Sequence, residues 1–195
     1  MPDGAERLGA MGNHVPVSFK TFLRPRNFGQ GRPPMNYSYN YWKAFDRWLN
    51  EKGSSWSIFA PVENHLCALR PKGRNLSISC GGSWYLSENR AKIGLMVMVK
   101  LQGSITSVYD NRWIPNRERI EEQMESEMSW SVFRPDLRWV TVRKRGLDFR
   151  KKEEQPEHFA WYEETVTHLK QTLFGEMPLE SFIRYGDQEM SQEVF

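Results

Sequence analysis

The segment IEEQMESEMSWSVFR, residues 120–134, changes its pattern halfway along and decides the fold class. In its first part the apolar residues Ile120, Met124 and Met128 recur every four positions, which is typical of one face of a helix. In its second part, SWSVF, polar and apolar side chains alternate as they do in a half-buried strand. The segment therefore predicts a helix that leads into a β-strand.

The acidic residues of this region have two interpretations. Glu118, Glu121, Glu122 and Glu125 could form a catalytic carboxylate cluster, or they could be the solvated face of the predicted helix. All four fall outside the apolar stripe, and early glutamates suit the positive end of a helix. We interpret them as the solvated face.

Two further helices flank the region. The segment 38–54 has one apolar stripe and a stop at Gly53, and its stripe consists of Tyr41, Phe45, Trp48 and Leu49. The segment 156–174 opens with Pro156 and closes before Gly175. Its stripe consists of Phe159, Tyr162, Val166, Leu169 and Leu173.

Short apolar runs between these helices predict strands. They are WSIFAP at 56–61, HLCALR at 65–70, LSISC at 76–80 and IGLMVMVKL at 93–101. A hairpin of SWSVF and LRWVTVRKR follows, with a turn at residues 134–136, and the helix before it is predicted to begin near Pro115. Hairpin connections favour antiparallel pairing. The sequence thus predicts an α+β fold, an antiparallel sheet with about three helices packed mainly on one face.

Composition sets the domain boundaries. Residues 1–37 are rich in Pro, Gly and Arg and predict an irregular basic and aromatic arm, which lies over the domain or contacts phosphates and bases. Residues 38–175 form the α+β domain, and residues 176–195 form an acidic tail. Eight Trp are interpreted mainly as core residues.

Charge and apolar content exclude some classes of protein. With 27 basic and 24 acidic residues the net charge is +3, too balanced for binding nucleic acid by bulk attraction. No apolar segment is long enough to cross a membrane and the start lacks a signal-peptide core, so we expect a cytoplasmic protein. Cys67 and Cys80 should then be reduced thiols, which could face each other across a hairpin.

Motifs for catalysis are missing. No Asp or Glu is followed two positions later by Lys, as a restriction-type nuclease requires for Mg²⁺ and its attacking water. A non-standard metal site centred on Asp148, with Asp110 or Glu121, stays open as an alternative. No phosphate-binding loop or nucleophile motif is present. We predict no catalytic residue, no metal ligand and no cofactor.

Basic residues at predicted hairpin ends are the main functional signal. If the sheet brings these ends to one edge, they form a patch for phosphates; otherwise they are ordinary solvated turns. The candidates are Arg70, Lys72, Arg74, Arg143, Lys144, Arg145, Arg150, Lys151 and Lys152.

Four segments resemble a bacterial family of domains of unknown function, number four thousand two hundred and sixty-eight. They are YWKAFDRWLNEKGS (41–54), RAKIGLMVMVKL (90–101), RIEEQMESEMSWSVF (119–133) and WYEETVTHLKQTLF (161–174). The resemblance covers roughly residues 39–175. One departure is that Glu127 and Met128 stand where a glycine often follows the family's Ile-Glu helix.

The resemblance implies a setting but no site residues. Such domains are often found after restriction-endonuclease-like or related DNA-processing domains. We therefore expect a non-catalytic binding module in bacterial or phage DNA metabolism, defence or counter-defence, which contacts nucleic acid or a DNA-processing protein partner and no membrane. The alternatives are a metal-dependent nuclease and a protein-interaction subunit or homodimer.

Overall fold

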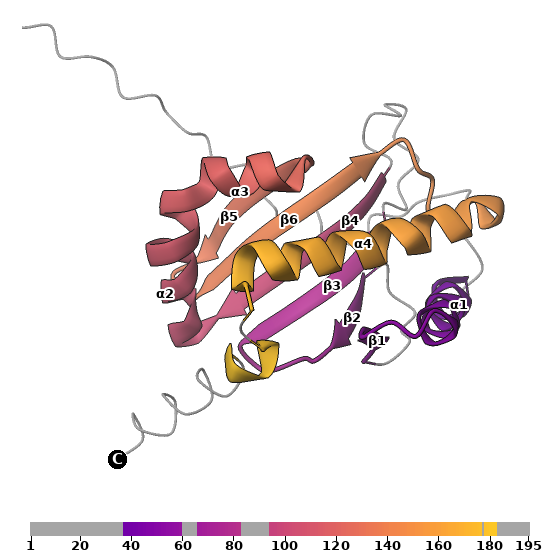
Figure 1. Ribbon diagram of the computed structural model, residues 1–195, viewed down its shortest axis with the longest axis horizontal. Helices are drawn as coiled ribbons and strands as arrows, with labels where there is room; N and C mark the ends of the chain where they lie inside the picture. The colour runs from indigo at the N-terminus through magenta and orange to yellow at the C-terminus, as the bar shows by residue number, and fades with distance from the viewer. Residues whose placement is uncertain (1–36, 60–65, 83–93, 177, 183–195) are drawn as a thin grey trace, which may run out of the picture. The chain divides into compact units, whose positions relative to one another are not determined.

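The computed structural model describes residues 37–59, 66–82, 94–176 and 178–182 (Figure 1). All of them belong to one unit, Pro33–Phe195. The predicted arm, apart from Tyr37, and most of the predicted acidic tail lie outside the described residues.

One antiparallel sheet of six strands organises the fold. Its strands are β1 (Ser57–Ile58), β2 (Leu66–Arg70), β3 (Leu76–Gly82), β4 (Gly94–Gln102), β5 (Glu127–Arg134) and β6 (Leu137–Arg145). Their order across the sheet is β1-β2-β3-β4-β6-β5, so β6 lies between β4 and β5. The predicted α+β class and the antiparallel pairing are confirmed.

The helices are α1 (Tyr37–Glu51), α2 (Thr106–Val108), α3 (Arg117–Met124) and α4 (Gln155–Phe174). A short 3₁₀ turn, Lys152–Glu154, leads into α4. A nearly continuous helical segment precedes α3 and begins at Gly103, earlier than the predicted start near Pro115. The sequence did not indicate this segment because it mixes 3₁₀, α and π turns, which share no single period.

The helices pack on one face of the sheet, as the sequence predicted. In β4 alternate residues Leu95, Val97, Val99 and Leu101 are buried, and α4 crosses this face (Figure 1). The predicted stripe of α4 is fully buried, and that of α1 is buried except for Trp48, which is partly exposed. The aromatic core between α1, α4 and the sheet includes Trp42, Phe45 and Phe149.

At the junction between α3 and β5 the structure differs from the prediction for Met128 and agrees with the prediction for the exposed glutamates. Met128 belongs to β5 and not to the helix, because α3 ends at Met124 and Glu125 adopts a left-handed conformation with φ 47°. Glu118, Glu122 and Glu125 are exposed, as expected of a solvated helix face. Glu121, the fourth glutamate of the run, is half-buried and accepts hydrogen bonds from Arg117 and Trp130.

Candidate nucleic-acid interface

Strand alternation gives the sheet a second face, which no described helix covers and which we call the helix-free face. In β4 and β6 the register pairs Met96 with Arg143, Met98 with Thr141 and Lys100 with Trp139 on this face. Their neighbours Val97, Val99, Val140 and Val142 point to the core. Polar contacts between the side chains of the helical segments and those of the strands lie on the core side, such as Trp130 with Glu121 and Arg138 with Asp110.

One row of the helix-free face runs across the sheet. Ser77 in β3 is opposite Lys100 in β4, Lys100 is opposite Trp139 in β6, and Trp139 is opposite Ser131 in β5. Arg70 in β2 extends the row, since it follows Ala68, which is opposite Ser79. The row thus contains two cations and an aromatic ring among small polar residues.

The helix-free face carries an excess of positive charge. Its described strand residues include four cations, Arg70, Lys100, Arg143 and Arg145, and one acidic residue, Glu127. Glu127 binds Arg145 with two contacts of 2.7 Å, and this ion pair holds the pKa of Glu127 below its usual value. Arg70, Lys100 and Arg143 form no ion pair within 4.0 Å of an acidic residue in the described parts of the chain, but Arg143 lies opposite Glu127 and its charge also lowers the pKa of that carboxyl group.

Aromatic rings lie at both ends of the row. Phe133 stacks on Trp139, with a distance of 5.0 Å between the ring centroids and an angle of 7° between the ring planes. Phe133 lies at a bulge of β5 between Val132 and Arg134. Phe133 is 39% exposed despite the stacking. At the other end Phe59 is 46% exposed, with the cations of Arg70 and Lys72 at 5.4 and 4.4 Å from its ring centroid.

The predicted hairpin ends do not meet at one edge. The β2–β3 turn, which carries Lys72 and Arg74, lies beside the end of β4, where the Gln102 N–H donates to the Asn75 carbonyl at 2.8 Å. The end of β6 lies beside the start of β4, with Arg145 opposite Gly94. Because β3 and β4 are antiparallel, these are opposite ends of the sheet, and the nine predicted cations do not form one patch.

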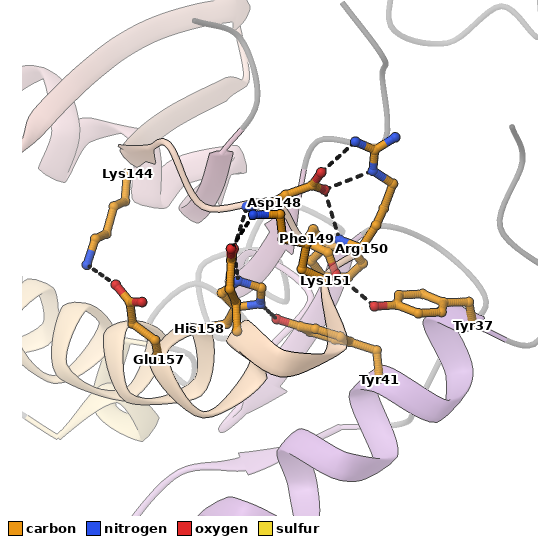
Figure 2. Close-up of polar contacts among 10 residues, drawn as sticks. Tyr37, Tyr41, Lys144, Asp148, Phe149, Arg150, Lys151, Glu157 and His158 are labelled. Atoms are coloured by element: carbon orange, nitrogen blue, oxygen red, sulfur yellow. Dashed lines mark hydrogen bonds and ion pairs between the residues drawn. The ribbon is translucent and has the colours of Figure 1, made fainter. Parts of the chain in front are cut away.

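The cations around the β6–α4 connection are largely paired with carboxylates (Figure 2). Lys144 points to the helical side and reaches Glu157 at 3.5 Å. Arg150 binds Asp148 through two contacts of 2.8 and 2.5 Å, and Lys151 binds Glu154 at 2.6 Å. The exposed Lys152 forms no ion pair with another residue in the described ranges. Of the predicted residues, Arg70, Arg143 and Arg145 belong to strands of the helix-free face, and Lys72 reaches this face at the ring of Phe59.

A buried polar network joins α1 to the start of α4 beneath these ion pairs (Figure 2). His158 is completely buried, with Nδ1 3.1 Å from the Tyr41 hydroxyl and Nε2 3.6 Å from a Glu154 carboxylate oxygen. Burial lowers the pKa of His158 from its ordinary value of 6.5, although Glu154 opposes the shift. Because both rings are inaccessible, we interpret this network as structural.

The carboxylates of the metal-site alternative are not gathered together. Asp110 is held by Arg138 at 3.0 and 2.9 Å, and Asp148 is held by Arg150, which lowers the pKa of Asp148. Glu121 accepts hydrogen bonds from Arg117 at 2.8 Å and from the Trp130 indole at 2.7 Å. Among the residues that the structure describes, no group of three or more His, Cys, Asp or Glu could hold a metal ion.

The two cysteines face each other across β2 and β3, as the hairpin spacing allowed, and both are thiols that form no disulfide with each other. Burial raises the pKa of Cys67 to about 12 and that of Cys80 well above its usual value. Neither side chain is therefore a thiolate at neutral pH, which is the form that attacks or binds metals.

The candidate site residues that the sequence analysis missed are Phe59, Lys100, Phe133 and Trp139. A partial signal was present, since Lys100 interrupts the most apolar run, and Trp139 alternates with Val140 and Val142 in β6. What the sequence lacked was the pairing of β4 with β6, which places Lys100 beside Trp139.

Comparisons with known proteins add no further assignment. No protein-family model matches the chain, and neither the curated proteins nor the solved structures contain a match. The resemblance to the domain family therefore stays a prediction. Within the described residues, none of the helices combines the length and the apolar character needed to span a membrane.

Proposed function

We propose that this chain is a non-catalytic module that binds nucleic acid on the helix-free face of its sheet. The observation that supports this function is the composition of that face, where cations without an acidic partner among the described residues lie together with exposed aromatic rings. Lysine and arginine side chains contact phosphates, and aromatic rings stack on bases. The proposed class of function is the one that the sequence predicted. The proposed binding site, however, is the helix-free face of the sheet and not the hairpin turns.

The helical side of the molecule offers a contrast that supports this choice. There Lys144, Arg150 and Lys151 are neutralised by acidic neighbours. Such cations attract phosphates less than Lys100 and Arg143 do, because an ion pair must first be broken. The helix-free face is therefore the stronger candidate.

Charge reversal tests the proposal. Labelled DNA and RNA, single- and double-stranded, are titrated at two salt concentrations with Mg²⁺ present. We expect salt-sensitive binding without cleavage, and at least tenfold weaker binding for Lys100→Glu combined with Arg143→Glu. Arg112→Glu combined with Arg119→Glu, at exposed positions of the helical segment before α3 and of α3, makes the same change in net charge; it is the matched control and should bind normally. Absence of binding at low salt, or equal weakening in the control, would contradict the proposal.

A protein-interaction or homodimer function is the second candidate, and one observation favours it. β5 is an edge strand, and its Val132 is 64% exposed, so the strand can pair with another chain. Sedimentation of the purified protein over a range of concentrations tests this: a monomer throughout would leave no support for the homodimer.

The setting in bacterial or phage DNA metabolism or defence rests on the family resemblance alone.

A further inference from the structure

The row across the helix-free face has a definite chemical order. It begins at the ring of Phe59, which Lys72 and Arg70 contact, continues from Arg70 to Lys100, and ends at the stacked rings of Trp139 and Phe133. Cations thus lie in the middle of the row, and aromatic rings lie at both ends. A polymer with regularly spaced phosphates and flat, unpaired bases matches this order.

The two ends of the row are far enough apart for several nucleotides. From β1, which Phe59 follows, to β5 the sheet has five strand spacings. At the usual 4.7–4.9 Å per spacing, this is roughly 24 Å. Small sheet domains that bind single strands cover about 4–16 nucleotides, so the length of the row fits the lower part of this range.

The aromatic ends favour a single strand over a duplex. In a duplex the bases are paired and stacked on one another, so only the phosphates would meet this face, and the rings of Phe59 and Phe133 would contact no base. In a single strand each base has a free flat face, and aromatic side chains stack on it with little sequence preference. Phe133 is already held flat against Trp139, which restricts its ring before any base arrives.

We propose that the helix-free face binds single-stranded nucleic acid in preference to duplex. The strand crosses the β-strands from Phe59 to Phe133, its phosphates lie near Arg70 and Lys100, and a base stacks on Phe133. This inference rests on the proposed function and adds the class of nucleic acid and the direction in which it lies.

Ring replacement tests the inference separately from the charge reversal. The probes are a labelled 12-nucleotide DNA, the corresponding RNA and a duplex of the same length, all at low salt. The single strands should bind at least tenfold more tightly than the duplex. Phe133→Leu, which keeps apolar bulk but removes the flat ring, should weaken single-strand binding about tenfold and leave duplex binding unchanged. Phe133→Trp should restore it.

A neighbouring residue provides the matched control. Val132 is more exposed than Phe133, but it lies opposite Arg138, whose side chain contacts the helical side. Val132→Ala should therefore bind single strands normally.

The results that would overturn this inference can be distinguished from those that would overturn the proposed function. Equal or tighter binding of duplex, or normal single-strand binding by Phe133→Leu, would overturn the inference, while weaker binding by the Lys100→Glu and Arg143→Glu variant would still support the proposed function. Failure of every probe to bind would overturn both.

Discussion

At Gly82 in β3 the core side of the sheet leaves no room for a side chain. An added Cβ would overlap with the ring of Phe149, which is completely buried. We expect Gly82→Ala to lower the free energy of unfolding by about 1–3 kcal/mol, because the overpacked ring must move. Urea unfolding measures the change.

The cause of that effect can be isolated with a second variant. If the Phe149 ring is the obstacle, Gly82→Ala combined with Phe149→Leu should lose less stability than the two single changes together. Simple additivity would show that the strain arises elsewhere.

The burial of His158 predicts a pH dependence of stability. Its pKa is lowered in the folded protein, so the unfolded protein binds more protons as the pH falls through about 6.5. The free energy of unfolding should therefore fall between pH 7.5 and pH 5.5. Tyr41, Glu154, Glu157 and Asp148 are the other groups that act on the ring.

Denaturant unfolding of the wild type and of His158→Gln at both pH values measures this contribution. The variant should be less stable at pH 7.5 but should lose less stability on acidification. A wild type and a variant with the same pH profile would show that His158 does not carry the effect.

At the scale of elements, the end of α3 is strained. Glu125 has φ 47° and ψ 29°, a left-handed conformation that costs most residues about 1 kcal/mol and costs glycine almost nothing. We expect Glu125→Gly to raise the free energy of unfolding by about 0.5–1 kcal/mol, and thermal unfolding is the measurement. Glu122→Gly, in the body of the same helix, is the control and should destabilise by about 1 kcal/mol. Destabilisation by both changes would show that the backbone at Glu125 is not strained.

One ion pair joins the helical segment before α3 to β6. Arg138 has a largely buried side chain and binds Asp110 through two contacts. Asp110→Ala should cost about 1–2 kcal/mol, because it leaves a buried guanidinium with fewer partners. Asp136→Ala is the control, since Asp136 and Arg134 are exposed and 4.0 Å apart, and should cost less than about 0.5 kcal/mol. Equal costs in urea unfolding would show that burial of Arg138 is unimportant.

At the scale of the whole molecule, the electrostatics of the helix-free face predicts how binding responds to salt. Each phosphate contact that a substitution removes should reduce the slope of log K against log salt by about 0.7 for a single strand. Lys100→Ala should show this reduction. Arg145→Ala should show less, because Glu127 already neutralises Arg145. Identical slopes for the wild type and Lys100→Ala would remove Lys100 from the interface.

The main elements could be predicted from the sequence because their signals are local. The stripes of α1 and α4, the stop at Gly53 and the alternation of β4 and β6 each depend on residues a few positions apart. The same reasoning assigned the glutamates near α3 to a solvated face. It placed Met128 wrongly in the helix, because Met128 continues the four-residue spacing of Ile120 and Met124. The left-handed conformation of Glu125, which ends the helix, leaves no mark on this spacing.

Which residues share the candidate site was decided only by the tertiary structure. Lys100 meets Trp139 because β6 pairs with β4 across a long connection, and Arg74 is separated from Arg143 because β3 and β4 are antiparallel. Neither fact has a local signal, since strand order and register are set by how the whole apolar face is buried. The sequence by itself thus determined the helices, the strands and their class of fold, whereas long-range pairing determined which cations and rings lie on one surface.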